Sequence, residues 1–114
     1  MKPIVYAYVI LAFAIISEVL GTLFLVKSEG FTKLVPSILV VLFYAFSFYA
    51  LSQITKTMNI GVVYAIWSGV GIVFTVIVGY YVFKQSLDFP ALLGIAFIVA
   101  GVLVMNLFSK TLSH

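Results

Sequence analysis

The sequence predicts an all-α membrane protein with four transmembrane helices. Hydrophobic residues occupy 65% of the 114 positions and charged residues only 8%, with a mean hydropathy of +1.32, which excludes an ordinary water-soluble domain. Four apolar runs follow one another, at about 3–26, 34–55, 58–83 and 88–109. Each run is long enough to cross a bilayer, because a spanning helix needs about 20 apolar residues. Short linkers join the runs, so we predict one four-helix domain over residues 1–114.

The ends of the runs carry the expected turn and capping residues. The first run continues well past Ala14, whereas the apolar part of a cleavable signal peptide would end sooner. We therefore interpret the first run as a membrane helix, with a chain break at Glu29–Gly30. Asp88 is a candidate N-cap of the fourth helix, and Pro90 then falls in the first turn, where no amide donor is lost.

Charge and composition exclude several classes of function. The net charge of +3 rests on six lysines in linkers and ends, and they do not cluster into a nucleic-acid footprint. The chain has no cysteine and one histidine, His114, so we expect no metal site and no thiol chemistry. We expect no cofactor, no catalytic residues and therefore no enzyme.

The lysines give no preferred orientation in the membrane. With four spans, three lysines fall on each side, whereas the positive-inside rule needs a difference between sides. One alternative is that the uncharged flanks or the N-terminal amine fix a single orientation. We expect instead that the chain inserts both ways and forms an antiparallel homodimer. The two sets are Lys2, Lys56 and Lys110, and Lys27, Lys33 and Lys84.

Glu18 is the charged residue inside the first run. A carboxylate deep in a bilayer costs about 2.5–3.5 kcal/mol on insertion scales, and no lysine lies at the same depth to neutralise it. We expect Glu18 to hold either a proton or a cation that comes from outside the protein. These two alternative occupants describe an exchanger.

Depth along the helices suggests a composite site. Glu18 lies roughly 5 Å beyond the middle of its run, and Trp67 lies as far before the middle of the third run, so the two are about 10 Å apart in depth within one subunit. Inverting one subunit brings Glu18 of one copy level with Trp67 of the other. We therefore predict a binding site at the dimer centre.

Small residues surround Glu18 on one helical face, which includes Gly21 and Leu25. They leave room for a guest beside the carboxylate, or they allow close helix packing; both interpretations stay open. The other site residues that we assign on this run are Leu11, Ala14, Ser17 and Thr22.

Aromatic residues near the middle of the second and third runs complete the candidate site. Trp67 and Tyr64 lie one turn apart, and Phe48 follows Tyr44 by one turn. Aromatic faces attract organic cations, and a hydroxyl from Tyr44 or Tyr64 could hydrogen-bond Glu18. The alternative is that these side chains only pack the core. The aromatic residues near helix ends are interpreted as interfacial: Tyr6, Tyr8, Tyr80, Tyr81 and Phe83.

Two further patterns concern movement and assembly. Gly/Ser pairs are sites of helix kinks, so a hinge is expected in the third run, although close packing would also explain its glycines. A stripe of small and apolar residues on the fourth run is the expected dimer contact. The hinge residues are Ser68, Gly69 and Gly71, and the interface residues are Gly94, Ile98, Gly101 and Met105.

Four segments together resemble the small multidrug resistance transporters over nearly the whole chain. They are SEVLGT around Glu18, KSEGF in the first linker, GVVYAIWSGVGI and LDFPALLGIAFIVAGVLVMN. The resemblance, best to the quaternary-ammonium branch, implies an antiparallel, dual-topology homodimer in the bacterial inner membrane. It also implies that Glu18 is the essential carboxylate and that the substrate contacts are Tyr44, Tyr64 and Trp67. The family's hinge glycines fall on Gly69 and Gly71, and its dimer motif on Gly94 and Gly101.

Three positions depart from a family member that carries lysine, tryptophan and arginine where this chain has Val26, Tyr49 and Ser86. They affect substrate range rather than mechanism. We predict a proton-coupled antiporter that exports lipophilic and quaternary ammonium cations by alternating access. The alternatives are a guanidinium or polyamine exporter, one subunit of a heterodimeric pair, and a non-transporting membrane scaffold.

Overall fold

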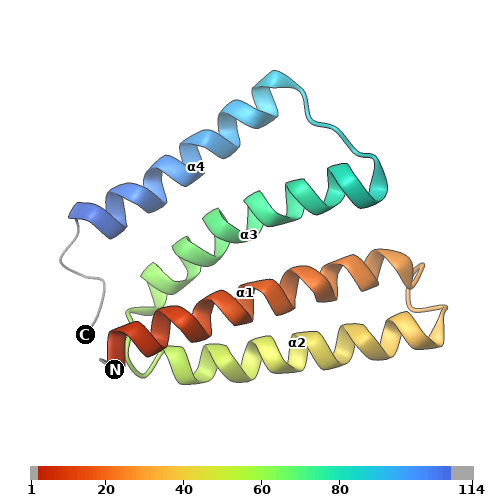
Figure 1. Cartoon of the computed structure of the whole chain (residues 1–114), viewed down its shortest axis with the longest axis horizontal. Coiled ribbons are helices and arrows are strands. Elements are labelled where there is room, and N and C mark those ends of the chain that lie inside the picture. The colour runs from red at the N-terminus through yellow and green to blue at the C-terminus, as the bar shows by residue number, and fades with distance from the viewer. Residues whose placement is uncertain (1–2, 109–114) are drawn as a thin grey trace. The chain divides into compact units, whose positions relative to one another are not determined.

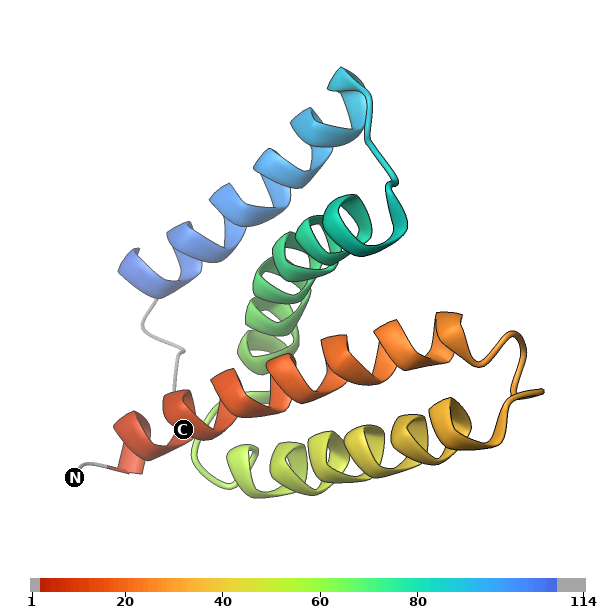
Figure 2. The same cartoon turned by 45° about the vertical axis from the view of Figure 1, so that its right-hand side comes forward.

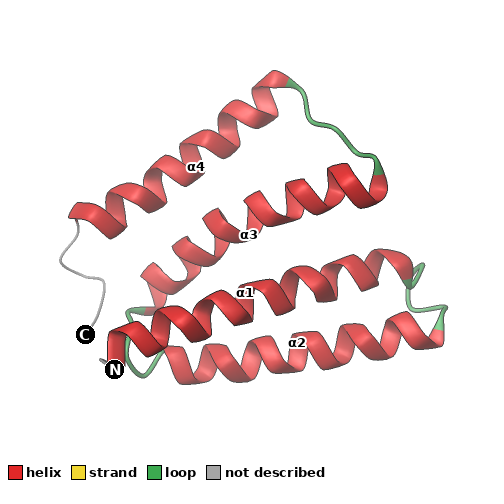
Figure 3. Ribbon diagram, in the orientation of Figure 1, coloured by secondary structure: helices red, strands yellow, loops and turns green. Residues whose placement is uncertain are grey.

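The computed structural model describes residues 3–108 and contains four helices joined by short loops (Figures 1 and 3). They are α1 (Pro3–Lys27), α2 (Leu34–Ile54), α3 (Ile60–Phe83) and α4 (Phe89–Phe108). Each is long and apolar enough to cross a membrane, which confirms the predicted all-α membrane class. The observed bounds differ from the predicted ones by two residues at most. Residue 109, Lys2, Lys110 and His114 lie outside the described residues.

All four helices are apolar around their whole circumference rather than along one stripe. Large apolar side chains remain exposed on every helix, for example Leu34 and Phe89 at 74% and Phe97 at 71%. A water-soluble bundle would turn such side chains inward, whereas lipid tails solvate them without cost. The exposed surface is therefore the surface expected for contact with lipid.

The chain divides into two compact units, residues 1–56 and 57–114. We call them the α1–α2 hairpin and the α3–α4 hairpin, and each is described by itself. A single domain over residues 1–114 stays a prediction.

In the α1–α2 hairpin the two helices lie side by side, as Figure 2 also shows. Two serine hydroxyls donate hydrogen bonds across the helix pair: Ser17 Oγ to the carbonyl oxygen of Phe43 and Ser47 Oγ to that of Ala14, both at 2.9 Å. The rings of Phe24 and Phe43 stack with centroids 5.9 Å apart. Hydroxyl donors and small residues let membrane helices approach closely, so this hairpin is held by polar as well as apolar contacts.

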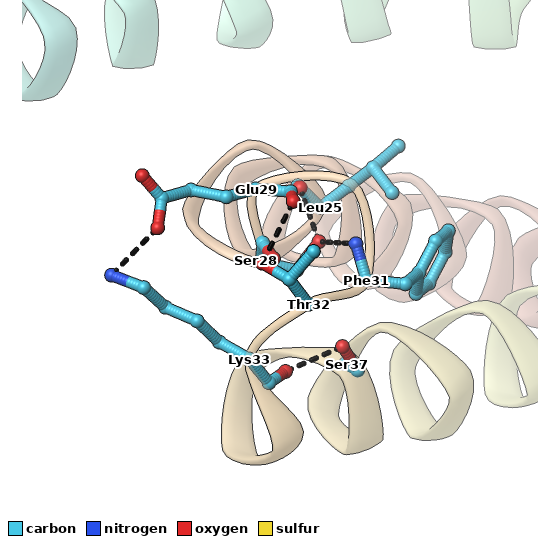
Figure 4. Close-up of polar contacts among 7 residues, drawn as sticks. All are labelled: Leu25, Ser28, Glu29, Phe31, Thr32, Lys33 and Ser37. Atoms are coloured by element: carbon cyan, nitrogen blue, oxygen red, sulfur yellow. Dashed lines mark hydrogen bonds and ion pairs between the residues drawn. The ribbon is translucent and has the colours of Figure 1, made fainter.

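The loop after α1 is ordered by one buried hydroxyl (Figure 4). Ser28 is fully buried, and its Oγ donates to the carbonyl oxygen of Leu25 at 2.7 Å and accepts the amide of Phe31 at 3.0 Å. Residues 29–31 have φ values of 50°, 73° and 64°, in the left-handed region that ends helices. The predicted chain break at Glu29–Gly30 is confirmed.

In the α3–α4 hairpin both helices begin with a side-chain cap. Asn59 accepts the amide of Gly61 at 2.9 Å, and Asp88 Oδ1 accepts the amide of Ala91 at 3.1 Å, so that Pro90 stands in the first turn of α4 as predicted. Such caps satisfy amides that have no partner inside the helix.

α4 packs loosely against α3. None of its residues is fully buried, and it approaches α3 closely at Gly69, where an added Cβ would lie 2.6 Å from Cγ2 of Val102. A cavity of about 240 Å³ adjoins this contact, and both residues line it. The α3–α4 hairpin thus leaves space between its helices.

Candidate functional site

Glu18 lies inside α1 and is half-buried. Within the α1–α2 hairpin, no described residue donates a hydrogen bond to its carboxylate or forms an ion pair with it. Glu29 differs, because its carboxylate pairs with Lys33 at 2.9 Å in the exposed loop. Among residues 3–108, no three His, Cys, Asp or Glu side chains gather as possible metal ligands. The carboxylate of Glu18 therefore has no partner among the described residues of its own hairpin.

Four residues on α1 near Glu18 are buried or closely approached, and three of them, Ala14, Ser17 and Gly21, contact α2. Leu11 and Ala14 are 1% and 0% exposed, and Ser17, 6% exposed, donates its hydroxyl to α2 as described. A Cβ added to Gly21 would lie 2.7 Å from ring atoms of Tyr44. Close helix packing therefore accounts for Ala14, Ser17 and Gly21, whereas room for a guest beside the carboxylate stays a prediction.

Tyr44 forms a hydrogen bond with Thr22 rather than with the carboxylate. The two hydroxyl oxygens are 2.7 Å apart, and either one can be the donor. The possible bond from Tyr44 to Glu18 is therefore not formed in this hairpin. The Tyr44 hydroxyl instead bonds to the hydroxyl of Thr22, which lies one turn after Glu18 on α1. Phe48, one turn beyond Tyr44, is 64% exposed.

Ser47 lies one turn after Tyr44 beside Phe48, and the sequence predicted no role for it in the site. Its hydroxyl is 2% exposed and donates to the carbonyl of Ala14, one turn before Glu18. The signal for it is a small polar residue inside an otherwise apolar run, which is common where membrane helices touch. Ser47 therefore fixes α2 against the segment that carries the carboxylate.

The two α3 aromatics belong to the other hairpin. Trp67 is partly buried and Tyr64 is 49% exposed. Both lie on α3, so neither hairpin alone contains the whole set of residues that we assign to the site. Their approach to Glu18 stays a prediction.

The expected hinge segment is helical without a break. α3 runs from Ile60 to Phe83, with Ser68 exposed and Gly69 and Gly71 buried. Gly69 provides the close approach of Val102, so packing accounts for one of the two glycines. A hinge at these residues stays a prediction.

The stripe on α4 is open. No heavy atom outside the helix's own backbone lies within 4 Å of a Cβ added to Gly94 or to Gly101. Ile98 is 41% exposed and Met105 is partly exposed. The stripe therefore lacks a partner in its own hairpin, and a dimer contact at these residues stays a prediction.

Comparison with known proteins places the chain in a family. The family model of the Small Multidrug Resistance protein matches residues 6–98. The multidrug transporter EmrE of Escherichia coli K12 is 45% identical over 107 residues, which cover 94% of this chain and 97% of EmrE. The multidrug transporter PA4990 of Pseudomonas aeruginosa is 49% identical, and the quaternary ammonium compound-resistance protein QacE of Escherichia coli is 43% identical, with the same coverage. The chain therefore belongs to the small multidrug resistance family.

Proposed function

We propose that this protein is a proton-coupled antiporter that exports lipophilic and quaternary ammonium cations across the bacterial inner membrane by alternating access. The observation that carries the proposal is a half-buried carboxylate, Glu18, that has no partner in its own hairpin and lies within a membrane-spanning helix. The names of its relatives, multidrug transporters and a quaternary ammonium compound-resistance protein, support the substrate class.

Proton entry is coupled to cation export because the proton and the cation compete for one carboxylate, that of Glu18. A proton neutralises Glu18, and so does a bound organic cation, but the carboxylate does not hold both. The empty, ionised carboxylate is costly inside the membrane, so the unoccupied protein changes its side of access slowly. Protons therefore enter by the path along which cations leave, without any covalent step.

The working unit in this proposal is an antiparallel homodimer. The equal division of lysines supports insertion in both orientations, and the open stripe at Gly94 and Gly101 supports a contact between copies. In such a dimer Trp67 and Tyr64 of one copy reach the depth of Glu18 of the other, where their rings hold the cation. Movement of the half-helices about Gly69 and Gly71 switches access.

Proteoliposomes with an imposed proton gradient test the function directly. Gradient-driven uptake of tetraphenylphosphonium is expected for the wild-type chain and is expected to vanish in Glu18→Gln, which cannot ionise. Glu18→Asp keeps the charge and is expected to retain part of the flux. Glu29→Gln is the matched control, because Glu29 is paired and exposed in a loop. Proton-coupled flux in Glu18→Gln would refute the proposal. Uptake of guanidinium without uptake of tetraphenylphosphonium would show that the substrates are guanidinium compounds instead.

Orientation is tested separately. The chain has no cysteine, so a single cysteine at Lys33 or Lys56 reports which side a loop occupies. We expect an impermeant thiol reagent to label about half of each variant from either side of the membrane. Labelling from one side alone would contradict the antiparallel dimer.

A further inference from the structure

Two adjoining cavities lie where α3 ends and α4 begins, away from the residues that we assign to the transport site. The first has a volume of about 290 Å³. Its wall is largely apolar, with Val76 and Ile77 from α3 and Leu87 and Leu92 from the loop and α4. A hydrocarbon chain fits the chemistry of this wall.

The second cavity, of about 430 Å³, has a mixed lining and is more polar than the first. Lys84 and Ser86 line it together with Tyr80 and Tyr81, whose rings meet edge to face with centroids 5.1 Å apart. Tyr80, Tyr81 and Ser86 also line the first cavity, so the two spaces share a wall and polarity changes from one to the other. Their volumes lie in or near the range of small-molecule sites.

We propose that these two cavities together bind one anionic glycerophospholipid. The phosphate lies against the Lys84 ammonium and the Ser86 hydroxyl, and one acyl chain enters the cavity lined by Val76, Ile77 and Leu92. Lys84 is exposed at the end of a membrane-spanning helix, the depth at which lipid phosphates lie. Basic pockets between membrane helices are known to take anionic headgroups.

The backbone holds Lys84 in place at this point. Its φ is 57°, and the amides of Lys84 and Gln85 both donate to the carbonyl oxygen of Gly79, the latter at 3.0 Å. The charged group of opposite sign nearest along the chain, Asp88, lines neither cavity, and its Oδ1 accepts the amide of Ala91. Lys84 is therefore the charged residue among those that line the second cavity.

The same charge argues against an organic cation as occupant. Tyr80 and Tyr81 alone would attract a cation through their rings, but the ammonium of Lys84 repels it. A free phosphate would use Lys84 and Ser86 and leave the apolar cavity empty. An anionic lipid fits both cavities at once, because its phosphate suits Lys84 and Ser86 and its acyl chain suits the apolar wall.

Native mass spectrometry of the full chain in detergent tests this with phosphatidylglycerol and phosphatidylethanolamine that share the same acyl chains. We expect a preference for phosphatidylglycerol. Lys84→Gln is expected to weaken phosphatidylglycerol binding about five-fold, as for one lysine near a lipid surface, and to weaken phosphatidylethanolamine binding less, because the ethanolamine ammonium offsets the charge of its phosphate. Lys27→Gln, the matched control at the end of α1, is expected to change neither.

A second pair of variants tests the apolar cavity. Leu92→Trp fills it and is expected to weaken binding of both lipids, whereas Leu93→Trp, which lines neither cavity, is expected to have no effect. Glycerol phosphate, which has no acyl chain, is expected not to compete. Equal loss in Lys84→Gln and Lys27→Gln would overturn the proposal in favour of diffuse charge attraction, and competition by glycerol phosphate would overturn it in favour of a phosphate site.

Discussion

The two hairpins are built from the same kind of apolar helices but are held together differently. α1 and α2 are joined by two serine hydrogen bonds and a tyrosine–threonine pair, and seven residues of α1 are buried. α4 has no buried residue, and a cavity of about 240 Å³ separates part of it from α3. The carboxylate thus lies on the tightly packed hairpin, whereas the expected hinge and dimer stripe lie on the loose one. The difference shows that Glu18 lies on the more tightly packed hairpin, whereas α4 packs loosely on α3.

Gly21→Ala is expected to have the largest effect of the five substitutions that test this comparison. The new Cβ would lie 2.7 Å from two Tyr44 ring atoms and 3.3 Å from the Cβ of Phe43, and overpacking of this kind costs about 1–3 kcal/mol. Equilibrium unfolding in detergent mixtures, with the chain monomeric, measures the loss. Gly94→Ala is the control, because its Cβ meets nothing within 4 Å. Equal stability of the two variants would contradict the tight packing of α1 on α2.

Ser47→Ala is expected to have the next largest effect. It removes the donor to the Ala14 carbonyl, and hydrogen bonds between membrane helices contribute about 0.6 kcal/mol on average and up to about 1.7. Ser52→Ala provides the comparison, since the exposed Ser52 hydroxyl bonds within its own helix, to the carbonyl of Tyr49. A similar unfolding free energy for both variants would show that the contact between helices adds nothing.

Tyr44→Phe and Thr22→Val remove opposite ends of one hydrogen bond. Each is expected to lower stability by about 0.6 kcal/mol, and the double variant by no more than either alone. Tetraphenylphosphonium affinities of the same two single variants and the double variant show whether the Tyr44 hydroxyl acts only through Thr22 or directly on Glu18. If Tyr44→Phe weakens binding and Thr22→Val does not, the hydroxyl acts on Glu18 directly, as the sequence suggested.

Gly69→Ala is expected to have the smallest effect on stability, although its Cβ would lie even closer to a neighbour, 2.6 Å from Cγ2 of Val102. Val102 can move into the adjoining cavity, and the gain in helix propensity, about 0.5–1 kcal/mol, offsets the cost of that movement. Unfolding free energies of Gly69→Ala and of Gly69→Ala with Val102→Ala are expected to be close. A loss as large as that of Gly21→Ala would show that α4 is held as firmly as α2.

The sequence predicted the helices and several helix ends because these depend on local chemistry. Apolar runs of bilayer length define the spans, and Asp88 and Glu29–Gly30 act on backbone groups a few residues away. The partners of Tyr44 and Ser47 were not predictable, because helices that are apolar all round carry no stripe to show which side faces a neighbour. The approach of Trp67 to Glu18, predicted from depth along the helices, requires a second copy of the chain and stays a prediction.

The most direct test of the central claim is the pH dependence of tetraphenylphosphonium affinity for the purified chain. If the cation and the proton compete for Glu18, affinity falls as the buffer is made more acidic, by up to about tenfold per pH unit for each proton displaced, and Glu18→Gln removes both the high affinity and its pH dependence. An affinity that stays constant from acidic to alkaline buffer, or that survives in Glu18→Gln, would contradict the account.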